Sequence, residues 1–505
     1  MDSHLNRFKS PILEIHKSEK FKNSVLGFGH FNSVHTGHIR YLKHAKEIGQ
    51  TFIVCIMKSI EGDARNVFSQ LDRAESVSQL GIADAIILLE DNSLFNAVEK
   101  LDPKSLVLGK EYENNSSDDI SSAIKFLKKK KKKIIYHAGD INYASSDLLL
   151  NSESQLKNER KKQFIKALNR QNISQQKLIE CCTRFQKSNL LVIGDSIVDQ
   201  YNACEALGMS AEAPVIVVKE LEQKSFIGGA AIVASHIASL GSNCHFISVV
   251  GDDEQGKWLK KILSEQSIES QLYIENKRPT TLKKRYIVEN QKLFRVSRLA
   301  NHMIENKTIA KIINYVEKNA KLLDGIVISD FVYGVITPDL LLALRDIAKK
   351  ENLFLFGDLQ CSSQVGNISK MRNFDLLCPN EKEARIALQD NENGLDLLCQ
   401  KMIAETGCKN LIMKLAADGV LVYSKDKNNS LKIQAFPALS VNPVDVTGAG
   451  DSMLAILSAS ITSGSSLIEA AALASYGASL VVESLGNQPV TIEGILERIK
   501  NCYSI

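Results

Sequence analysis

NPVDVTGAGDSMLAIL, residues 442–457, is the stretch that decides the fold of the C-terminal part of this chain. Its approach ends at Asp445, a Gly-Ala-Gly turn follows, and Asp451 opens an apolar helix. Glycines let the backbone of such a turn come close to an anion, and amides at a helix start hold negative charge on a phosphoryl group. The expected anion-binding turn comprises Gly448, Ala449 and Gly450. Asp451 follows directly and is placed to take the proton from an attacking hydroxyl.

A plain glycine-rich turn with an N-capping aspartate is the alternative for this motif. The complete DVTGAGD ahead of an apolar helix favours phosphoryl transfer instead. From Asn189 onward, strand-like runs such as LLVIGDSIVD, CHFISVVG, GIVISDF and LFLFGD alternate with helical patterns, which predicts an α/β fold. Two runs without intervening helices, PVIVVKEL and TLKKRYIVENQKLFRV, predict a small β-sheet that projects as a lid.

A second alternation of strands and helices begins near the N-terminus. VLGFG and TFIVCIM predict buried strands on either side of a helix at IRYLKHAKEIG, and AIILL and SLVLG predict two more, so a parallel sheet is expected. The polar segment from Asn151 has apolar residues at helical spacing and predicts a helical linker. The expected order is an extension (1–24), a first α/β domain (25–150), the linker (151–188) and a second α/β domain (189–505).

The overall composition limits the function only loosely. Apolar residues make up 44% of the 505 and charged residues 24%, with a net charge of +4, so no nucleic-acid partner is expected. The sequence shows no bilayer-spanning stretch and no signal-peptide core, so we expect a cytoplasmic protein without membrane contact. The ten cysteines lack CxxC spacing, which favours reduced thiols over a metal site. We interpret the run Lys128–Lys133 as a solvated helix end rather than an anion-binding patch.

Three motifs resemble those of the ribokinase (pfkB) family of carbohydrate kinases: GGAAIVASHIASLG, CPNEKEAR and DVTGAGD, in that order. The resemblance runs from about residue 189 to the C-terminus. It implies a ribokinase-like domain that uses ATP and Mg²⁺ and has a β lid. It also implies that the helix after Gly228 and Gly229 packs at the sugar pocket. The residues that it implies near magnesium and the ATP phosphates are Asn380, Glu383 and Lys414.

Longer stretches are similar to the kinase half of the bifunctional heptose-phosphate kinase/adenylyltransferases of lipopolysaccharide-core synthesis. They include LVIGDSIVDQY, RPTTLKKRYIVENQKLFRV and VISDFVYG. This resemblance implies that Asp195 and Asp199 meet sugar hydroxyls. It also implies that Lys283 and Arg285 face the sugar or its phosphate, with a solvated strand face as the alternative. Three residues depart from the heptose pattern, so the accepted sugar is expected to differ. They are Ile232, Tyr333 and Gln360.

The N-terminal part contains a second candidate site in GHFNSVHTGHIRYLKHAKEIG, residues 29–49. His35 and His38, in HxGH spacing at a helix start, can donate hydrogen bonds to an α-phosphate as charge builds during in-line attack. A zinc pair is an alternative, but no third ligand with matching spacing follows. Surface histidines are the other alternative. With GxFN ahead of it, the motif resembles the cytidylyltransferase-like nucleotidyltransferase superfamily over about residues 25–150.

That resemblance implies further nucleotide-binding residues along the first domain. They are Gly29, Phe31, Asn32, Gly37, Arg73, Gly109, Ser145 and Ser146. Asn32 stands where many members carry aspartate. Ser145 and Ser146 match a helix start that cradles the β- and γ-phosphates, and plain N-capping is the alternative for this pair.

Together the two resemblances imply consecutive reactions on a sugar. The kinase would phosphorylate a sugar or a heptose 7-phosphate-like sugar phosphate at its anomeric hydroxyl. The first domain would then join the sugar 1-phosphate to a nucleotide and release pyrophosphate. ATP and an ADP-sugar are favoured. One alternative is CTP with a CDP-linked product from a different polyol or sugar phosphate. Another is that only one domain is active and the other is a regulatory or binding module. The heptose enzymes carry the kinase first, but here it is second. A homodimer through the lid is also implied.

Overall fold

The computed structural model describes residues 9–32, 34, 36–58, 68–109, 118–137, 153–266, 268–289, 291–361, 364–425 and 431–504. The chain divides into two compact units. The first comprises residues 1–156 with 389–401, and the second comprises residues 157–388 with 402–505. Across the described ranges, no helix is both long enough and apolar enough to span a bilayer.

The first unit is built on a six-stranded sheet in which every neighbouring pair is parallel, in the order β1-β4-β3-β2-β5-β6. This confirms the predicted parallel sheet. The strands are β1 (Ile12–Glu14), β2 (Val25–Gly29), β3 (Phe52–Ile56), β4 (Ala85–Leu88), β5 (Ser105–Gly109) and β6 (Lys133–His137). The helical elements are η2 (Ile15–Lys17), η3 (Glu19–Phe21), α1 (Thr36–Glu47), α2 (Gln70–Gln79), α3 (Leu94–Leu101) and α4 (Asp118–Lys129).

Apolar runs form these strands because the sheet is covered on both faces. Successive side chains of a strand point to opposite faces, and neighbours in β3 accordingly join different cores. Phe52 and Val54 belong to one hydrophobic cluster, whereas Ile53 and Cys55 belong to the other. The segment expected as an extension contributes to the same sheet, since β1 pairs with β4.

The second unit has a nine-stranded central sheet in the order β11-β10-β7-β14-β15-β16-β17-β18-β19. The strands from β11 to β17 are parallel, and β18 and β19 continue the sheet in antiparallel pairs. The strands are β7 (Asn189–Gly194), β10 (Asn243–Val250), β11 (Glu269–Ile274), β14 (Gly325–Asp330), β15 (Phe354–Leu359), β16 (Leu376–Leu377), β17 (Asn410–Lys414), β18 (Val420–Lys425) and β19 (Leu431–Phe436).

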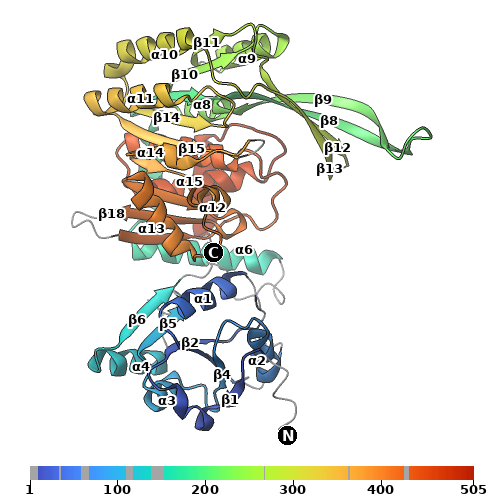
Figure 1. The fold of residues 1–505 in the computed structure, drawn as a ribbon. Coiled ribbons are helices and arrows are strands. Elements are labelled where there is room, and N and C mark those ends of the chain that lie inside the picture. Colours follow the sequence, from blue (N-terminus) through green and yellow to red (C-terminus); the bar gives the residue numbers. More distant parts are fainter. Residues whose placement is uncertain are drawn as a thin grey trace. The chain divides into compact units, whose positions relative to one another are not determined.

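A separate four-stranded sheet projects from the body of the second unit and forms the predicted lid (Figure 1). Its order is β13-β12-β8-β9. The strands are β8 (Ser196–Met209), β9 (Ile216–Gly229), β12 (Thr281–Val288) and β13 (Gln291–Arg298). The lid was expected from two sequence runs, and β8 adds a long strand that pairs with both β9 and β12.

The helices that follow β6 in the chain belong mainly to the second unit. They are α6 (Glu153–Arg170), α7 (Gln175–Thr183), α8 (Ala230–Ser239), α9 (Glu254–Glu265), α10 (Asn306–Asn319), α11 (Pro338–Glu351), α12 (Glu381–Leu388), α13 (Leu395–Thr406), α14 (Ala449–Thr462), α15 (Leu467–Val481) and α16 (Ile492–Tyr503), with short turns η5 (Phe185–Lys187), η6 (Ala320–Leu322), η7 (Ile368–Lys370) and η8 (Ala416–Asp418). Several of them, such as α8, α11 and α14, pack on the central sheet of this unit. The first residues of α6 and most of α13 belong to the first unit. The segment expected as a linker is helical where described, but Phe164, Leu168 and Leu178 pack into the second unit's core.

Helix α14 carries the glycine-rich turn at its N-terminus. Every residue from Asp451 to Ser460 is buried, as expected for a helix that is apolar on all sides. The helix packs against α8 and α15 and against β14 and β15. A buried, closely packed helix therefore holds the turn and Asp451 in fixed positions.

Candidate functional site

Asp451 lies in the first turn of α14 and is buried. Its Oδ1 accepts a hydrogen bond from Gln360 Nε2 at 2.6 Å, and Gln360 directly follows β15. Burial raises the pKa of the Asp451 carboxyl to about 7, and the nearby Asp358 carboxylate contributes to the rise. A carboxyl group with a pKa near neutrality can both accept and release a proton, which suits a general base.

A buried lysine lies beside the glycine-rich turn. Lys414, at the end of β17, donates to both carboxylate oxygens of Asp358, at 2.8 and 2.7 Å. A side-chain carbon on Gly450 would lie only 3.2 Å from Lys414 Nζ. Burial alone would lower the pKa of this ammonium, but Asp358 raises it above its usual value, so Lys414 stays charged. The turn and a fixed positive charge therefore meet at Gly450.

The turn also reaches the residues predicted to bind sugar. Gly448 caps α14 with a φ of 82°, in the left-handed region that glycine enters readily. A carbon placed on it would lie 2.5 Å from Asn487 Oδ1, and Asn487 Nδ2 donates to Asp199 Oδ2 at 3.0 Å. Asp199 also forms an ion pair with Arg285 of the lid. A carbon on Gly228 would lie 2.2 Å from Asp199 Oδ2, so glycine is needed there for this approach. Gly229, its neighbour, caps α8 with a φ of 65°.

Asp195 makes contacts with the backbone that the sequence did not predict. Its Oδ2 accepts hydrogen bonds from the amides of Phe331 and Tyr333, at 2.9 and 3.2 Å, and its Oδ1 accepts one from Val335 at 3.1 Å. Burial and the neighbouring Asp330 raise the pKa of its carboxyl to about 6. Both oxygens thus bind the backbone of the loop after β14, and a contact of Asp195 with sugar hydroxyls stays a prediction.

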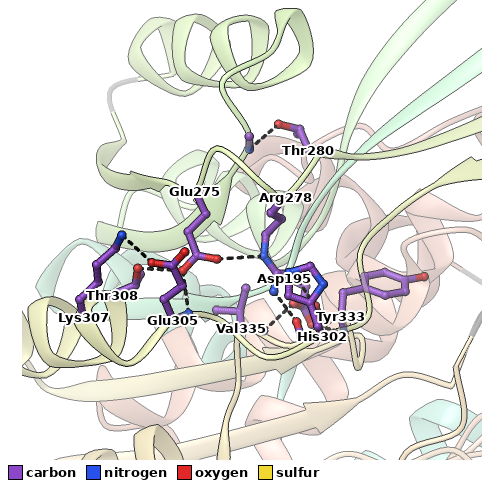
Figure 2. Close-up of polar contacts among 11 residues, drawn as sticks. Asp195, Glu275, Arg278, Thr280, His302, Glu305, Lys307, Thr308, Tyr333 and Val335 are labelled. Atoms are coloured by element: carbon purple, nitrogen blue, oxygen red, sulfur yellow. Dashed lines mark hydrogen bonds and ion pairs between the residues drawn. The ribbon is translucent and has the colours of Figure 1, made fainter.

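A second buried charge holds this loop from its carbonyl side, as Figure 2 shows. Arg278 donates to the carbonyl of Tyr333 at 2.7 Å and to the carbonyl of His302. Glu275 lies 3.4 Å from Arg278 Nε and accepts from the Thr308 hydroxyl at 2.8 Å. Asp195 therefore holds three amides of the loop, and Arg278 holds one of its carbonyls, that of Tyr333.

The lid places Lys283 over the two aromatic rings of the same loop. Lys283 Nζ lies 5.4 Å from the ring centroid of Phe331 and 5.3 Å from that of Tyr333. Lys283 pairs in register with Asp199 across β12 and β8, and it is buried. Arg285, two residues along β12, has a side chain that is 12% exposed. A solvated strand face is therefore excluded for both cations.

The three departures from the heptose pattern have distinct surroundings. Ile232 is buried in the hydrophobic core of the second unit. Tyr333 is buried in the loop after β14, next to Phe331. Gln360 contacts Asp451 directly. Among the three, Gln360 is therefore the one that touches the proposed base.

Asn380 and Glu383 form a reciprocal cap at the start of α12. Glu383 N donates to Asn380 Oδ1, and Asn380 N donates to Glu383 Oε2, both at 2.8 Å. The other oxygen of Glu383 accepts from the Cys361 amide at 3.3 Å. Burial raises the pKa of Glu383, although Lys414 nearby opposes the rise. The pair thus fixes a helix end close to Lys414.

These residues fit the phosphates of ATP better than a directly bound metal ion. Gly450 leaves a space beside the Lys414 ammonium that any larger residue would fill, and the amides at the start of α14 are suited to an anion. The buried carboxylates nearby already have partners, since Asp358 binds Lys414 and Glu383 binds two amides. Mg²⁺ commonly keeps several waters and binds through substrate phosphates, which is compatible with this arrangement.

The first unit places its predicted nucleotide site at one edge of its sheet. β2 pairs with β3 on one side and with β5 on the other, so the order of strands reverses between β2 and β5. Open α/β sheets bind ligands at the carboxyl ends of strands that flank such a reversal. Gly29 ends β2 and Gly109 ends β5, and the GxFN and HxGH sequences follow β2 directly.

His38 is the described histidine of this motif. It lies in the first turn of α1, with its ring centroid 5.0 Å from that of the buried Phe31. Gly37 precedes it in α1, and Asn32 is partly buried in the loop before the helix. His35, Ser145 and Ser146 lie outside the described residues.

Arg73 connects loops at the same edge. It is buried and donates to the carbonyls of His30 at 2.5 Å, Met57 at 2.7 Å and Phe68 at 3.3 Å. These carbonyls belong to the segments that follow β2 and β3 and precede α2. Because its guanidinium binds three backbone carbonyls, Arg73 links the described residues His30, Met57 and Phe68 near the predicted nucleotide site.

The lysine run ends one helix and leads into the next strand. Lys128 and Lys129 form the last turn of α4, and β6 begins at Lys133. Lys130 Nζ lies 3.2 Å from Asp102 Oδ1, and Lys132 Nζ lies 3.7 Å from Asp102 Oδ2. The arrangement matches the expected solvated helix end.

Sequence reasoning missed several residues of the second unit's site. They are Asp358, Asn487, Tyr201 and Lys292. Their contacts join segments that lie far apart in the chain, so no local motif contains them.

The solved structures that resemble this chain establish the fold of the second unit. A ribokinase from Thermotoga maritima is 22% identical, with a TM-score of 0.50 over 62% of this chain and 100% of its own. Phosphofructokinase-2 from Escherichia coli is 16% identical, with a TM-score of 0.52 over 62% of this chain and 99% of its own. The second unit is therefore a ribokinase-like α/β kinase fold with a projecting β lid.

Models of two protein families match the sequence of this chain. The family model for pfkB carbohydrate kinases matches residues 187–493, so the chain belongs to the pfkB family of carbohydrate kinases. A cytidylyltransferase-like model matches residues 26–248. Both resemblances inferred from the motifs, and their order along the chain, are confirmed.

Two curated relatives that match about three fifths of this chain carry the word bifunctional in their names. The protein named "Bifunctional protein HldE" from Nitratiruptor sp. is 33% identical over 62% of this chain and 65% of its own length. The protein of that name from Campylobacter jejuni subsp. doylei is 34% identical over 61% of this chain and 64% of its own. The match thus spans just under two thirds of the length of these relatives.

Proposed function

We propose that the second unit transfers the γ-phosphate of ATP to a hydroxyl of a sugar or sugar phosphate, with Asp451 as the general base. The observation that carries this proposal is the position of Asp451. It is buried, its pKa is raised to about 7, and it directly follows a glycine-rich turn that lies against the Lys414 ammonium. Membership of the pfkB family supports the same reaction.

In the proposed reaction, the oxygen of the sugar hydroxyl forms a bond to the γ-phosphorus of ATP, and Asp451 takes the proton of that hydroxyl. The bond from that phosphorus to the bridging oxygen breaks, and ADP leaves with the electron pair. The amides of Gly448, Ala449 and Gly450 and the charge of Lys414 stabilise the phosphoryl oxygens. Magnesium, when bound with ATP, supplies additional neutralisation of phosphate charge.

Asp451→Asn tests the base. The substitution keeps the shape of the side chain but removes its ability to take a proton. Sugar-dependent ADP release is expected to fall by at least about 100-fold. Pyrophosphate release from a supplied sugar 1-phosphate should remain. Kinase turnover close to that of the unchanged protein would rule out Asp451 as the base.

For the first unit we propose nucleotidyl transfer to a sugar 1-phosphate. A phosphate oxygen of the sugar 1-phosphate forms a bond to the α-phosphorus of ATP. The bond from that phosphorus to the oxygen that bridges the α- and β-phosphates breaks, and pyrophosphate leaves with the electron pair. His38, at the start of α1 beside the β2–β5 reversal, would donate a hydrogen bond to the α-phosphate. The match to the cytidylyltransferase-like model supports this assignment.

His38→Ala is the complementary test. Removing the imidazole should reduce pyrophosphate release about 100-fold or more while sugar-dependent ADP release continues. His44→Ala is a matched control, because His44 lies two turns further along α1. If His38→Ala and His44→Ala had equal effects, the assigned role of His38 would be wrong.

Joined in one chain, the two activities would make a nucleotide-activated sugar. The acceptor favoured by the resemblance is a heptose 7-phosphate-like sugar phosphate, phosphorylated at its anomeric hydroxyl, and the favoured product is an ADP-sugar. A CDP-linked product is the second candidate, because the first unit matches a cytidylyltransferase-like model. Mass spectrometry of the products formed from a panel of sugar phosphates with ATP or CTP distinguishes an ADP-sugar from a CDP-linked product. If only the phosphorylated sugar or only the nucleotidyl-transfer product formed, a single unit would be active.

The lid also supports a proposed homodimer. Several large apolar side chains are exposed on its strands or their connection, and patches of this kind commonly bind another protein surface. They are Leu207, Met209, Val215, Ile216, Leu221, Phe294 and Val296. A second copy of this chain is the proposed occupant.

A further inference from the structure

Asp445, at the approach to the glycine-rich turn, is bound by two residues of the lid. Lys292 Nζ on β13 donates to Asp445 Oδ1 at 2.8 Å, and Tyr201 Oη on β8 donates to Asp445 Oδ2 at 2.8 Å. The side chain of Asp445 is 1% exposed, whereas that of Lys292 is 45% exposed. A buried carboxylate in the body of the second unit is thus held by side chains that reach in from the lid.

The same carboxylate shapes the turn itself. Asp445 Oδ1 also accepts from the Thr447 hydroxyl at 2.7 Å and from the Thr447 amide at 3.1 Å. Thr447 is followed by Gly448, which caps α14 in the left-handed conformation. A displacement of Asp445 would therefore move the amides that are proposed to bind the phosphoryl oxygens.

The lid side of this contact is itself held in place. The Arg285 guanidinium lies 5.1 Å from the centroid of the Tyr201 ring and forms an ion pair with Asp199. The ring of Phe226 on β9 packs edge-on against the Tyr201 ring, with 5.3 Å between the two ring centroids. Four lid strands thereby contribute to the contact with Asp445, because β13 supplies Lys292 and the other three fix or carry Tyr201.

The contact does not depend on protonation near neutral pH. Burial alone would raise the pKa of Asp445, but the hydrogen bonds from Lys292, Thr447 and Tyr201 lower it to about 2. Asp445 is therefore charged throughout the working range, and the contact depends on where the lid lies.

We propose that Lys292 and Tyr201 are positioning residues that hold the glycine-rich turn in its anion-binding geometry, through Asp445, when the lid is seated. The inference rests on the proposed kinase function. Neither residue needs to touch the reacting atoms. Removing Lys292 leaves a buried carboxylate without its charged donor, and small displacements of a catalytic group cost large factors in rate.

Steady-state kinetics of sugar-dependent ADP release test the proposal. Lys292→Met should lower kcat about tenfold or more while KM for ATP and for the sugar changes less than about threefold. Lys292→Arg should restore most of kcat, and Tyr201→Phe should cause a smaller loss. In the double variant, the loss should be less than the product of the single losses, since both residues act on one carboxylate. Lys219→Met is the control, because Lys219 lies on β9 in a surface ion pair with Glu205.

Amide hydrogen exchange supplies a readout that needs no turnover. Lys292→Met should speed exchange at residues 446–450 and leave the interior of α14 unchanged. Unchanged exchange there, or a rise in KM with kcat intact, would overturn the positioning role. Faster exchange in a protein that shows no sugar-dependent ADP release would uphold the contact and contradict the proposed function instead.

Discussion

The proposed role of Asp451 depends on neighbours from two strands, Asp358 on β15 and Lys414 on β17, and on Gln360 directly after β15. Its carboxyl is buried, close to Asp358, and bonded to a neutral amide from Gln360. Lys414 lowers the pKa of Asp451 less than burial and Asp358 raise it, and the result is about 7. Only the ionised carboxylate can accept the sugar's proton, so activity should rise with pH through this value.

Gln360→Lys tests this balance at the residue scale. An ammonium next to Asp451 favours the ionised carboxylate, so the acid limb of kcat/KM for the sugar should move to lower pH by about one unit. Gln360→Met removes a hydrogen bond that lowers the pKa, and its acid limb should move to higher pH. The measurement is the pH profile of ADP release. Identical acid limbs in all three proteins would show that another group controls the profile.

At the scale of elements, the loop after β14 is held from both sides by buried charges. Asp195 binds three of its amides, and Arg278, supported by Glu275, binds the carbonyl of Tyr333. Val332, between the two anchored rings, has a φ of 64°, a conformation that costs free energy for a β-branched residue. The buried network keeps the loop in this strained form.

Arg278→Met should therefore be strongly destabilising. It leaves Glu275 buried without its cation, and breaking a buried pair in this way costs about 3–5 kcal/mol. The measurement is thermal unfolding of the full chain. Arg298→Met is the matched control, since Arg298 is 49% exposed and lies 3.5 Å from Asp253, and surface pairs contribute about 0–1 kcal/mol. Equal shifts in the two variants would contradict the structural role of Arg278.

Elements with a local signature were predictable from the sequence, and contacts between distant elements were not. The apolar runs at β2, β3 and β5 and the helix after DVTGAGD were located correctly because burial fixes their composition. β8 was missed as a lid strand because its buried start, SIVDQY, continues directly from β7, and its exposed end lacks an apolar pattern.

The candidate site of the second unit likewise combines a local motif that the sequence reveals with long-range contacts that it does not. The glycine-rich turn is a local motif, so the sequence locates it. The bonds of Asp445 to Tyr201 and Lys292 span 244 and 153 residues, and that of Asp199 to Asn487 spans 288. Such contacts are set by packing of the lid and the central sheet, which one sequence does not reveal.

At the scale of the whole molecule, the parallel sheet of the first unit and the mostly parallel central sheet of the second unit each supply a candidate site. In the first unit the site lies where the strand order reverses, beside Gly29 and Gly109. In the second it lies at the ends of β15 and β17, where Asp358 and Lys414 meet α14. Each proposed reaction is thus assigned to groups within a single unit.

The proposed homodimer gives a prediction at this scale. The combined substitutions Leu207→Glu and Ile216→Glu place two charges among the exposed apolar side chains of the lid, so dimers should dissociate. Light scattering after size-exclusion chromatography measures the mass. Leu322→Glu is the control, because Leu322 is exposed on η6, outside the lid. A monomeric unchanged protein, or a dimer that survives both charges, would contradict the lid interface.

In the second unit, the groups proposed for phosphoryl transfer and some of the groups proposed to bind the acceptor lie on different elements. The proposed base and the proposed anion-binding turn belong to a single buried helix, whereas Lys283 and the loop after β14 come from other elements. Substitutions at Lys283 or in that loop, unlike those at the lid contact with Asp445, are therefore expected to alter which molecule is accepted and to leave the phosphoryl transfer in place. A lineage with this architecture can acquire a new acceptor without rebuilding its phosphoryl-transfer apparatus.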